Sequence, residues 1–213
     1  MNAMDFNNAE PQRAMGDLIP DNTVCLVVAT LRPGGEGPGG WLKANNDRSC
    51  LMADFEFTID GGEFDRRKFW SLFVVDGQTD GQQKAANISR SKLRAMLESA
   101  YGVQPGDTSP DAVAKRQIAG WQAFDGLKFC AKVGIEVGKL KVPAAGPNSE
   151  RYPDKNVLKA AITPDEIIYI NPGPQAAGMK TAGAALTSAA NAAGGAVQQA
   201  VQQASAAKPS WAS

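Results

Sequence analysis

The fold depends on the stretch Arg66-Arg67-Lys68-Phe69-Trp70-Ser71-Leu72-Phe73-Val74-Val75, in which three cations run directly into a block of aromatic and β-branched residues. Such residues fit a pleated, half-buried surface, so the stretch predicts a strand. With Phe69 and Phe73 turned to the core, alternation places Lys68 and Trp70 on the outer face. Cations attract phosphates and exposed rings stack on bases, so this face suits a single-stranded nucleic acid. The alternative is that the rings are core and the cations a solvated strand end.

The neighbouring strand is predicted at residues 51–59, where apolar and polar residues alternate. The turn that follows contains Gly61-Gly62. A two-residue turn there would place Phe55 opposite Lys68 and mix the core and solvent faces. We therefore expect a bulge or an odd-length loop that places Phe55 opposite Phe69.

Three further strands are predicted, at residues 23–31, 127–137 and 156–163. The first ends at a run of glycine and proline, residues 33–40, which cannot hold a strand ladder and is read as a flexible loop. The second shows the cleanest alternation in the chain and predicts a strand with one buried face. The connection over 138–155 is long and basic, so the last two strands form a basic hairpin.

Two helices are predicted between the third and fourth strands. The first covers residues 87–100, with Ser89 as its N-cap and Gly102 as its stop, and it follows a polar loop over 76–86. The second runs from residue 110 to about 122. The two helices thus form an insert in a chain whose other predicted elements are strands.

Five strands with a helical insert between the third and fourth match an OB-fold-like barrel, so the predicted class is mainly β. Residues 1–22 form an N-terminal extension and 23–165 the barrel domain. Residues 171–213 are rich in alanine, glycine and glutamine, and too poor in large apolar residues to bury a core. They predict a disordered or partly helical tail.

The composition limits the functions the chain can have. Lysine plus arginine equals aspartate plus glutamate at 22 each, so a nucleic-acid site must be a local patch. The absence of histidine excludes Ser-His and Cys-His nucleophile pairs and every His-ligated metal. Cys25, Cys50 and Cys130 are far apart in sequence and predict buried thiols in a reducing compartment, not a disulfide frame or zinc site. We expect a cytoplasmic protein with no membrane segment, cofactor or enzymatic activity.

In an OB-fold, strands 2 and 3 with loops 1-2 and 4-5 bind oligonucleotides or oligosaccharides. Three features of the sequence fall on that surface: the basic aromatic strand, the glycine-rich loop with its tryptophan, and the basic loop of the last hairpin. Trp41 is either a lid on the barrel or a stacking platform. The candidate residues for single-stranded DNA are Trp41, Lys43, Arg48, Arg66, Lys68, Trp70, Lys128, Lys132, Lys139, Lys141, Arg151, Tyr152 and Lys155.

Several motifs resemble a family of phage and prophage proteins of unassigned domain type, whose genes are often found beside recombination genes. The motifs are Asp5–Glu10, Leu18–Thr23, Lys68-Phe69-Trp70, Asn87–Arg90 and Leu93–Leu97, and the similarity covers roughly residues 5–165. The resemblance implies sequence-independent binding of single-stranded DNA in phage replication or recombination. It also implies a place in the bacterial host cytoplasm, with replication or recombination proteins as partners.

Two other functions stay open. A phage structural or assembly protein would use the barrel and the tail for self-association and would form a defined homo-oligomer. A magnesium-dependent nuclease would use Asp54 and Glu56, because paired carboxylates can hold the ion. A solvated strand face is the favoured interpretation of these two carboxylates, since the Glu-x-Lys element that commonly accompanies such a site is missing.

Overall fold

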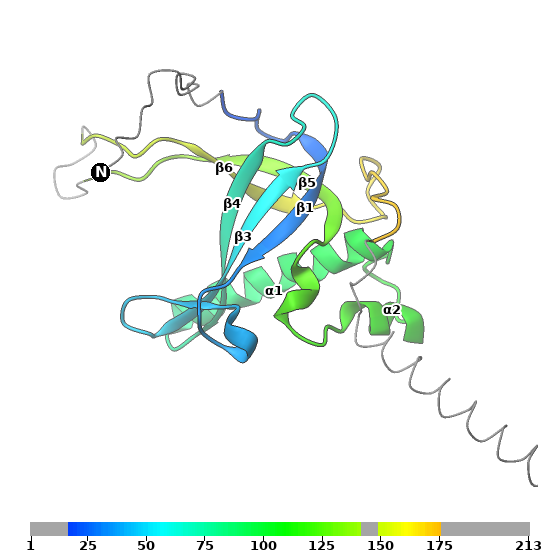
Figure 1. The fold of residues 1–213 in the computed structure, drawn as a ribbon, viewed down its shortest axis with the longest axis horizontal. Helices are drawn as coiled ribbons and strands as arrows, with labels where there is room; N and C mark the ends of the chain where they lie inside the picture. Colours follow the sequence, from blue (N-terminus) through cyan, green and yellow to red (C-terminus); the bar gives the residue numbers. More distant parts are fainter. Residues whose placement is uncertain (1–16, 142–148, 176–213) are drawn as a thin grey trace, which may run out of the picture.

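The computed structural model describes residues 17–141 and 149–175, and this part of the chain is mainly β (Figure 1). It contains an antiparallel sheet of six strands, with helices packed against one end of it. The strands are β1 (Val24–Arg32), β2 (Lys43–Ala44), β3 (Cys50–Ile59), β4 (Lys68–Gly77), β5 (Lys128–Glu136) and β6 (Lys155–Ala161). The helices are α1 (Asp80–Tyr101) and α2 (Pro110–Arg116), with single 3-10 turns at η1 (Pro38–Gly40) and η2 (Trp121–Phe124).

The central strand of the sheet is β3, which pairs with β4 on one side and with β1 and the short β2 on the other. β1 also pairs with β5, and β5 with β6. The two end strands, β4 and β6, approach each other, and the N–H of Leu158 donates to Oγ of Ser71 at 2.8 Å. In the described ranges no backbone ladder joins them, so the sheet is open along this seam.

The predicted strand faces are confirmed, but the predicted register is wrong by two residues. Phe69 and Phe73 are buried, while Lys68 and Trp70 are exposed. Phe69 lies opposite Phe57 instead of Phe55. The odd-length loop is confirmed: the last paired residues are Thr58 and Lys68, and the nine residues 59–67 lie between them. The strand pairing therefore ends at this pair, and the loop is longer than expected.

A bulge at Arg66 lies at the loop end of this pairing. Arg66 has a φ of 62°, and its N–H donates to the C=O of Ile59 at 2.9 Å. The N–H of Ile59 in turn donates to the C=O of Arg67, also at 2.9 Å. Two residues of one strand thus face a single residue of the other, which is the geometry of a β-bulge.

Phenylalanine rings fill the space between the sheet and α1. Phe57 is fully buried, and its ring centroid lies 5.2 Å from that of Phe69, 5.7 Å from that of Phe55 and 5.8 Å from that of Phe129. The apolar face of α1 closes this core with Leu93, Met96, Leu97 and Ala100. Because α1 packs on β4, β5 and β6, it holds the two ends of the open sheet together.

The first helix begins earlier than predicted. Its N-cap is Thr79, whose Oγ1 accepts from the N–H of Gln82, while Oε1 of Gln82 accepts from the N–H of Thr79. This reciprocal capping box satisfies two backbone donors at the helix start. The prediction of Ser89 as N-cap was wrong, because Ser89 is buried within α1. The predicted loop over 76–86 is helical from Asp80, whereas the stop at Gly102 is confirmed by its φ of 65°.

The segment after the second helix was also predicted incorrectly. α2 ends at Arg116, because Gln117 is extended, with φ −89° and ψ 131°. The chain then turns back, and Ile118, Trp121 and Phe124 pack on the core. The early stop therefore lets three apolar side chains reach the core.

β5 is buried on both faces at its centre, in contrast to the one buried face that its alternation predicts. Cys130 points to the face opposite Phe129, yet both are fully buried. The N–H of Cys130 donates to Oγ of Ser99 in α1 at 3.0 Å. Tyr169 donates its O–H to the C=O of Ser99 at 2.9 Å, so the segment after β6 covers this face together with α1.

All three cysteines are free thiols, and Cys50 and Cys130 are buried. Cys25 is half-buried, and this burial raises its pKa to about 11. Within residues 17–141 and 149–175, no helix combines the length and apolar character needed to cross a bilayer. The predicted tail lies outside the described residues from 176 onward.

Candidate functional site

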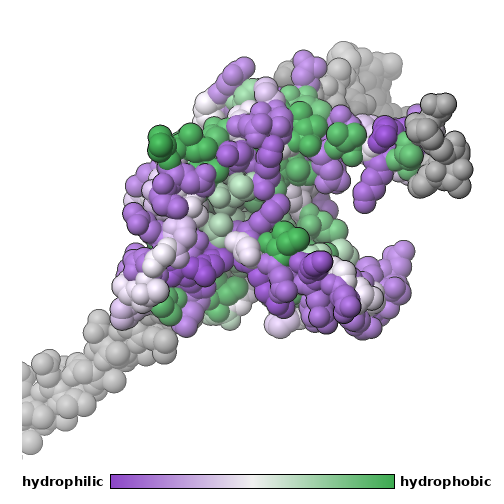
Figure 2. Space-filling model, turned by 180° about the vertical axis from the view of Figure 1, so that it is seen from behind, coloured by the Kyte–Doolittle hydropathy of each residue, from purple (hydrophilic) through white to green (hydrophobic). Residues whose placement is uncertain are grey.

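A groove of about 570 Å³ runs along the outer face and free edge of β4. We call it the β4 groove. The space-filling view shows this flank hollowed between the arm at the ends of β5 and β6 and the segment that connects β1 to β3 (Figure 2). Its lining residues are Leu18, Lys43, Asp54, Arg67, Lys68, Phe69, Trp70, Ser71, Leu72, Asp154, Lys155 and Asn156.

The floor of the β4 groove consists of the outward residues of β4. Lys68, Trp70 and Leu72 occupy alternate positions of the strand and therefore share one face. Trp70 is 46% exposed and Leu72 is 53% exposed, so two large apolar side chains of this strand face solvent. The strand thus presents an aromatic ring and an aliphatic side chain to a ligand, with a cation beside them.

Glu56 of β3 fixes the positions of Lys68 and Trp70. One carboxylate oxygen lies 2.6 Å from Nζ of Lys68, and the other accepts from Nε1 of Trp70 at 3.1 Å. The contact with the Lys68 ammonium, aided by the indole N–H, holds the pKa of Glu56 below its ordinary value. Because the indole N–H is tied to β3, the Trp70 ring is held in one orientation on the groove floor. A ring that is fixed before binding loses less conformational entropy when a base stacks on it.

Asp54, two residues before Glu56, brings two more cations to the same face. Its Oδ2 accepts from Nη2 of Arg32 at 2.8 Å and also from Nζ of Lys43. Asp54 is 7% exposed, so the carboxylate depends on these partners for its solvation. The pairing holds Lys43 beside the groove although β2 has only two residues. The two carboxylates of the nuclease hypothesis therefore both bind cationic side chains.

The opposite wall of the groove comes from the start of β6 and the segment before β1. The buried amide of Asn156 accepts from the N–H of Ile19 and donates to the C=O of Ile19, both at 2.8 Å. These two bonds fix the segment that carries Leu18. Lys155 is 62% exposed and pairs with Glu136 at 3.3 Å. Two chain segments far apart in sequence thus form one wall.

The structure brings four of the predicted site residues together in the β4 groove: Lys43, Lys68, Trp70 and Lys155. Trp41 is half-buried and packs against the core. Arg48 pairs with Glu36 at 2.5 Å in a separate recess.

The other predicted residues lie away from the groove lining. Arg66 is exposed at the tip of the β3–β4 hairpin. Lys128 pairs with Asp60 at 2.5 Å, and Lys132 lies on β5 opposite Val24. The residues on the β5–β6 arm are Lys139, Lys141, Arg151 and Tyr152, of which Lys141 lies over the Tyr152 ring at 5.9 Å.

Eight of the twelve lining residues were not among the candidate residues, and three of them show why. Leu72 follows Lys68 and Trp70 at the same spacing, so the alternation that selected them also indicates it. Arg67 reaches the groove because the bulge at Arg66 changes the direction of the strand, which no local pattern reveals. Leu18 lies in the groove because its neighbour Ile19 is hydrogen-bonded to Asn156. These two residues are 137 positions apart in the sequence, so no local pattern predicts the contact.

The Glu56 contacts predict a pH-dependent contribution to stability. Since the folded pKa lies below the unfolded one, the contribution is present above the unfolded pKa and is lost as pH falls through the folded pKa. Urea unfolding of the wild type and Glu56→Gln should differ by up to about 1 kcal/mol at pH 7, as expected for a partly exposed pair. The difference should be smaller at pH 3 than at pH 7, because the carboxylate takes up a proton as pH falls. An equal difference at both pH values would show that the carboxylate charge has no role.

No protein-family model matches the chain, and neither a curated protein nor a solved structure is similar to it. In the described ranges, no cluster of three or more cysteine and carboxylate side chains has the geometry to hold a metal ion. The functional assignment therefore depends on the chemistry of the β4 groove itself: a fixed, exposed indole beside four cationic side chains.

Proposed function

We propose that the protein binds single-stranded DNA without sequence specificity in the β4 groove. The observation that carries this proposal is the Trp70 ring, 46% exposed, fixed by Glu56 and set among Lys43, Arg67, Lys68 and Lys155. Aromatic rings stack on any base, because every base has a π face, and cations follow the phosphates. A duplex keeps its bases stacked inside, so the indole favours a single strand.

The charge of the groove agrees with a polyanionic ligand. Its four cations exceed its two carboxylates, Asp54 and Asp154, although the whole chain has no net charge. Two of these cations also contact carboxylates outside the lining, Lys68 with Glu56 and Lys155 with Glu136, so a phosphate would compete with these partners. Each cation that contacts a phosphate releases counterions, so affinity should fall with salt.

The strand arrangement supports an OB-type barrel as part of the same proposal. The order of strands and the helix between β4 and β5 fit that architecture, with β4 and β6 as the partly open seam. The β4 groove then coincides with the surface that such barrels use, since β3 and β4 take the places of strands 2 and 3. Lys43 comes from the segment between β1 and β3, which corresponds to loop 1-2 of such a barrel. Lys155 is the first residue of β6, at the end of the segment between β5 and β6, which corresponds to loop 4-5. The resemblance to phage proteins near recombination genes suggests replication or recombination as the setting.

The decisive experiment is fluorescence anisotropy of a labelled oligothymidine titrated with the full chain at low and high salt, with a duplex of equal length as control. Trp70→Ala should lower affinity by about 5- to 150-fold, because one stacked base contributes about 1 to 3 kcal/mol. Trp70→Phe keeps a ring but loses the bond to Glu56, so it should retain most of the affinity.

A matched pair of charge variants tests the location of the site. Lys68 and Arg48 are both exposed and both paired with a glutamate, but only Lys68 lines the groove. Lys68→Gln should weaken binding and flatten its salt dependence, whereas Arg48→Gln should change neither. No binding at low salt, or equal affinity for the duplex, would contradict the proposal.

A further inference from the structure

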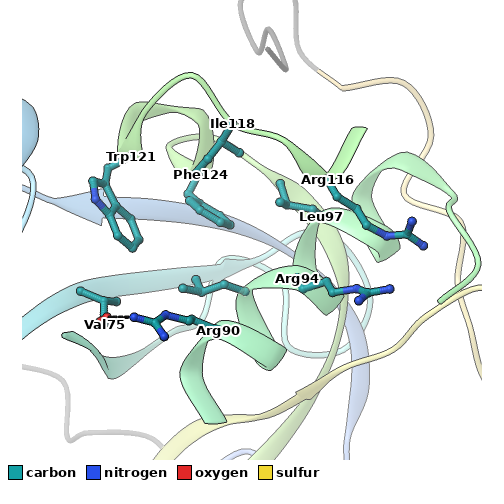
Figure 3. Close-up of a pocket in the computed structure, with 9 residues that line it drawn as sticks. Val75, Arg90, Arg94, Leu97, Arg116, Ile118, Trp121 and Phe124 are labelled. Atoms are coloured by element: carbon teal, nitrogen blue, oxygen red, sulfur yellow. Dashed lines mark hydrogen bonds between the residues drawn. The ribbon is translucent and has the colours of Figure 1, made fainter. Parts of the chain in front are cut away.

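The structure contains a second recess, between α1 and the segment that follows α2, and it shares no residue with the β4 groove. We call it the α1 recess. Figure 3 shows Trp121, Phe124 and Ile118 projecting from one side toward Val75 and Arg90 on the other. Its lining residues are Val75, Arg90, Leu93, Arg94, Leu97, Arg116, Ile118, Trp121 and Phe124. Six apolar side chains and three arginines thus surround it, and no carboxylate is among them.

We propose that the α1 recess binds an acidic peptide segment of a partner protein through one large apolar side chain. The recess has a volume of about 270 Å³. Pockets for cofactors and other small molecules usually occupy about 300 to 1,000 Å³, so this one is small for such a ligand. It is of the size that a single anchor side chain fills at a protein–protein interface.

The lining favours a peptide over a nucleobase. Five of the lining side chains, Val75, Leu93, Leu97, Ile118 and Phe124, carry no polar atoms. A base placed among them would leave several of its hydrogen-bonding groups without partners, which is costly in an apolar site. A phenylalanine, leucine or methionine side chain has no such groups to satisfy.

The rim favours acidic residues beside that anchor. Arg116 is fully engaged: it pairs with Glu98 and donates to three backbone carbonyls. Arg94 uses Nε for Glu98 and Nη2 for the C=O of Pro105, and its side chain remains 54% exposed. Arg90 is exposed and makes one bond of 3.1 Å to Asn87 and one of 3.3 Å to the C=O of Val75.

Arg90 and Arg94 therefore keep donors for a ligand. They lie one helical turn apart on α1, at the spacing that places side chains on one face. Carboxylates on either side of the apolar anchor could each meet one guanidinium. The complementarity is electrostatic at the rim and hydrophobic in the recess, which is the usual anatomy of a protein interface.

The test is selection of a random peptide library on the immobilised full chain, followed by fluorescence polarisation of the selected peptides. We expect selected sequences to share one large apolar residue flanked by aspartate or glutamate. Arg90→Glu should lower their affinity about tenfold or more, because it reverses a charge at the rim. Lys84→Glu is the matched control, since Lys84 is exposed on the same helix but outside the recess, and it should leave affinity unchanged.

Other outcomes would overturn the inference. Failure to select any peptide, selection of sequences without acidic residues, or binding that ignores Arg90→Glu would each do so. A loss of oligothymidine affinity in Arg90→Glu as large as that in Trp70→Ala would assign the recess to the nucleic acid instead. Peptide binding with no oligothymidine binding by the wild type would contradict only the proposed function of the β4 groove.

Discussion

Phe57→Ala should lower the free energy of unfolding by about 3 to 5 kcal/mol, the range for truncating a buried phenylalanine. Phe57 has no exposed surface and contacts three other aromatic rings, one each from β3, β4 and β5. Its removal would leave a cavity where three strands of the open sheet meet. Urea unfolding followed by circular dichroism measures the loss, provided that the slope against denaturant stays constant.

Leu72→Ala is the matched control for the core prediction. Leu72 is on β4 like Phe69, but it is 53% exposed and points into the β4 groove. Its truncation removes little buried surface, so the loss should stay within about 0.5 kcal/mol. A loss below about 1 kcal/mol in Phe57→Ala would mean that the aromatic cluster does not hold the sheet together.

Arg116→Ala should lower stability by about 3 kcal/mol, because it removes the more buried partner of a buried carboxylate. Glu98 is 3% exposed and accepts from Nε of both Arg116 and Arg94, at 2.7 and 2.8 Å. Arg116 is 14% exposed and also binds the carbonyls of Gln104, Pro105 and Asp107. Its loss would free the loop between α1 and α2 and would leave Glu98 paired only with the more exposed Arg94 among the described arginines.

Arg94→Ala provides the comparison for Arg116, since both guanidiniums contact the same oxygen of Glu98. The Arg94 side chain is 54% exposed and donates to one backbone carbonyl only. Water can replace much of the hydrogen bonding that Arg94 provides, so its removal should lower the free energy of unfolding by about 1 kcal/mol. Thermal or urea unfolding of the two variants side by side tests this order. An equal loss in both would show that burial of the arginine does not control the strength of the pair.

Local sequence patterns predicted the strands, their faces and some of the helix ends. Alternation along β4 selected the buried and exposed residues correctly, because the side-chain period of a strand is a property of its backbone, whereas Asp54 on the outer face of β3 is buried. Gly102 ended α1 as predicted, since glycine adopts a positive φ without strain. The true start of α1 also had a local signal, the capping box of Thr79 and Gln82, which the sequence analysis overlooked in favour of Ser89.

The register of the β3–β4 hairpin needed the tertiary structure. Two registers that differ by two residues keep every side chain on the same face, so alternation does not distinguish them. The bulge at Arg66 and the packing of Phe57 on Phe69 decided between the two. Alternation in β5 did not reveal that α1 and Tyr169 cover its second face at Cys130, because it reports the direction of each side chain and not what packs over it.

Only part of the candidate site could be predicted from the sequence. Lys68 and Trp70 were identifiable, because their chemistry and their shared face are both local properties of one strand. The rest of the β4 groove depends on contacts between distant segments: Asp54 draws in Lys43, and Asn156 fixes the segment that carries Leu18. The sequence by itself determined which side chains share a strand face. Only the tertiary structure decided which of them meet in one groove, because burial and hydrogen bonding between remote segments set those positions and no local spacing encodes them.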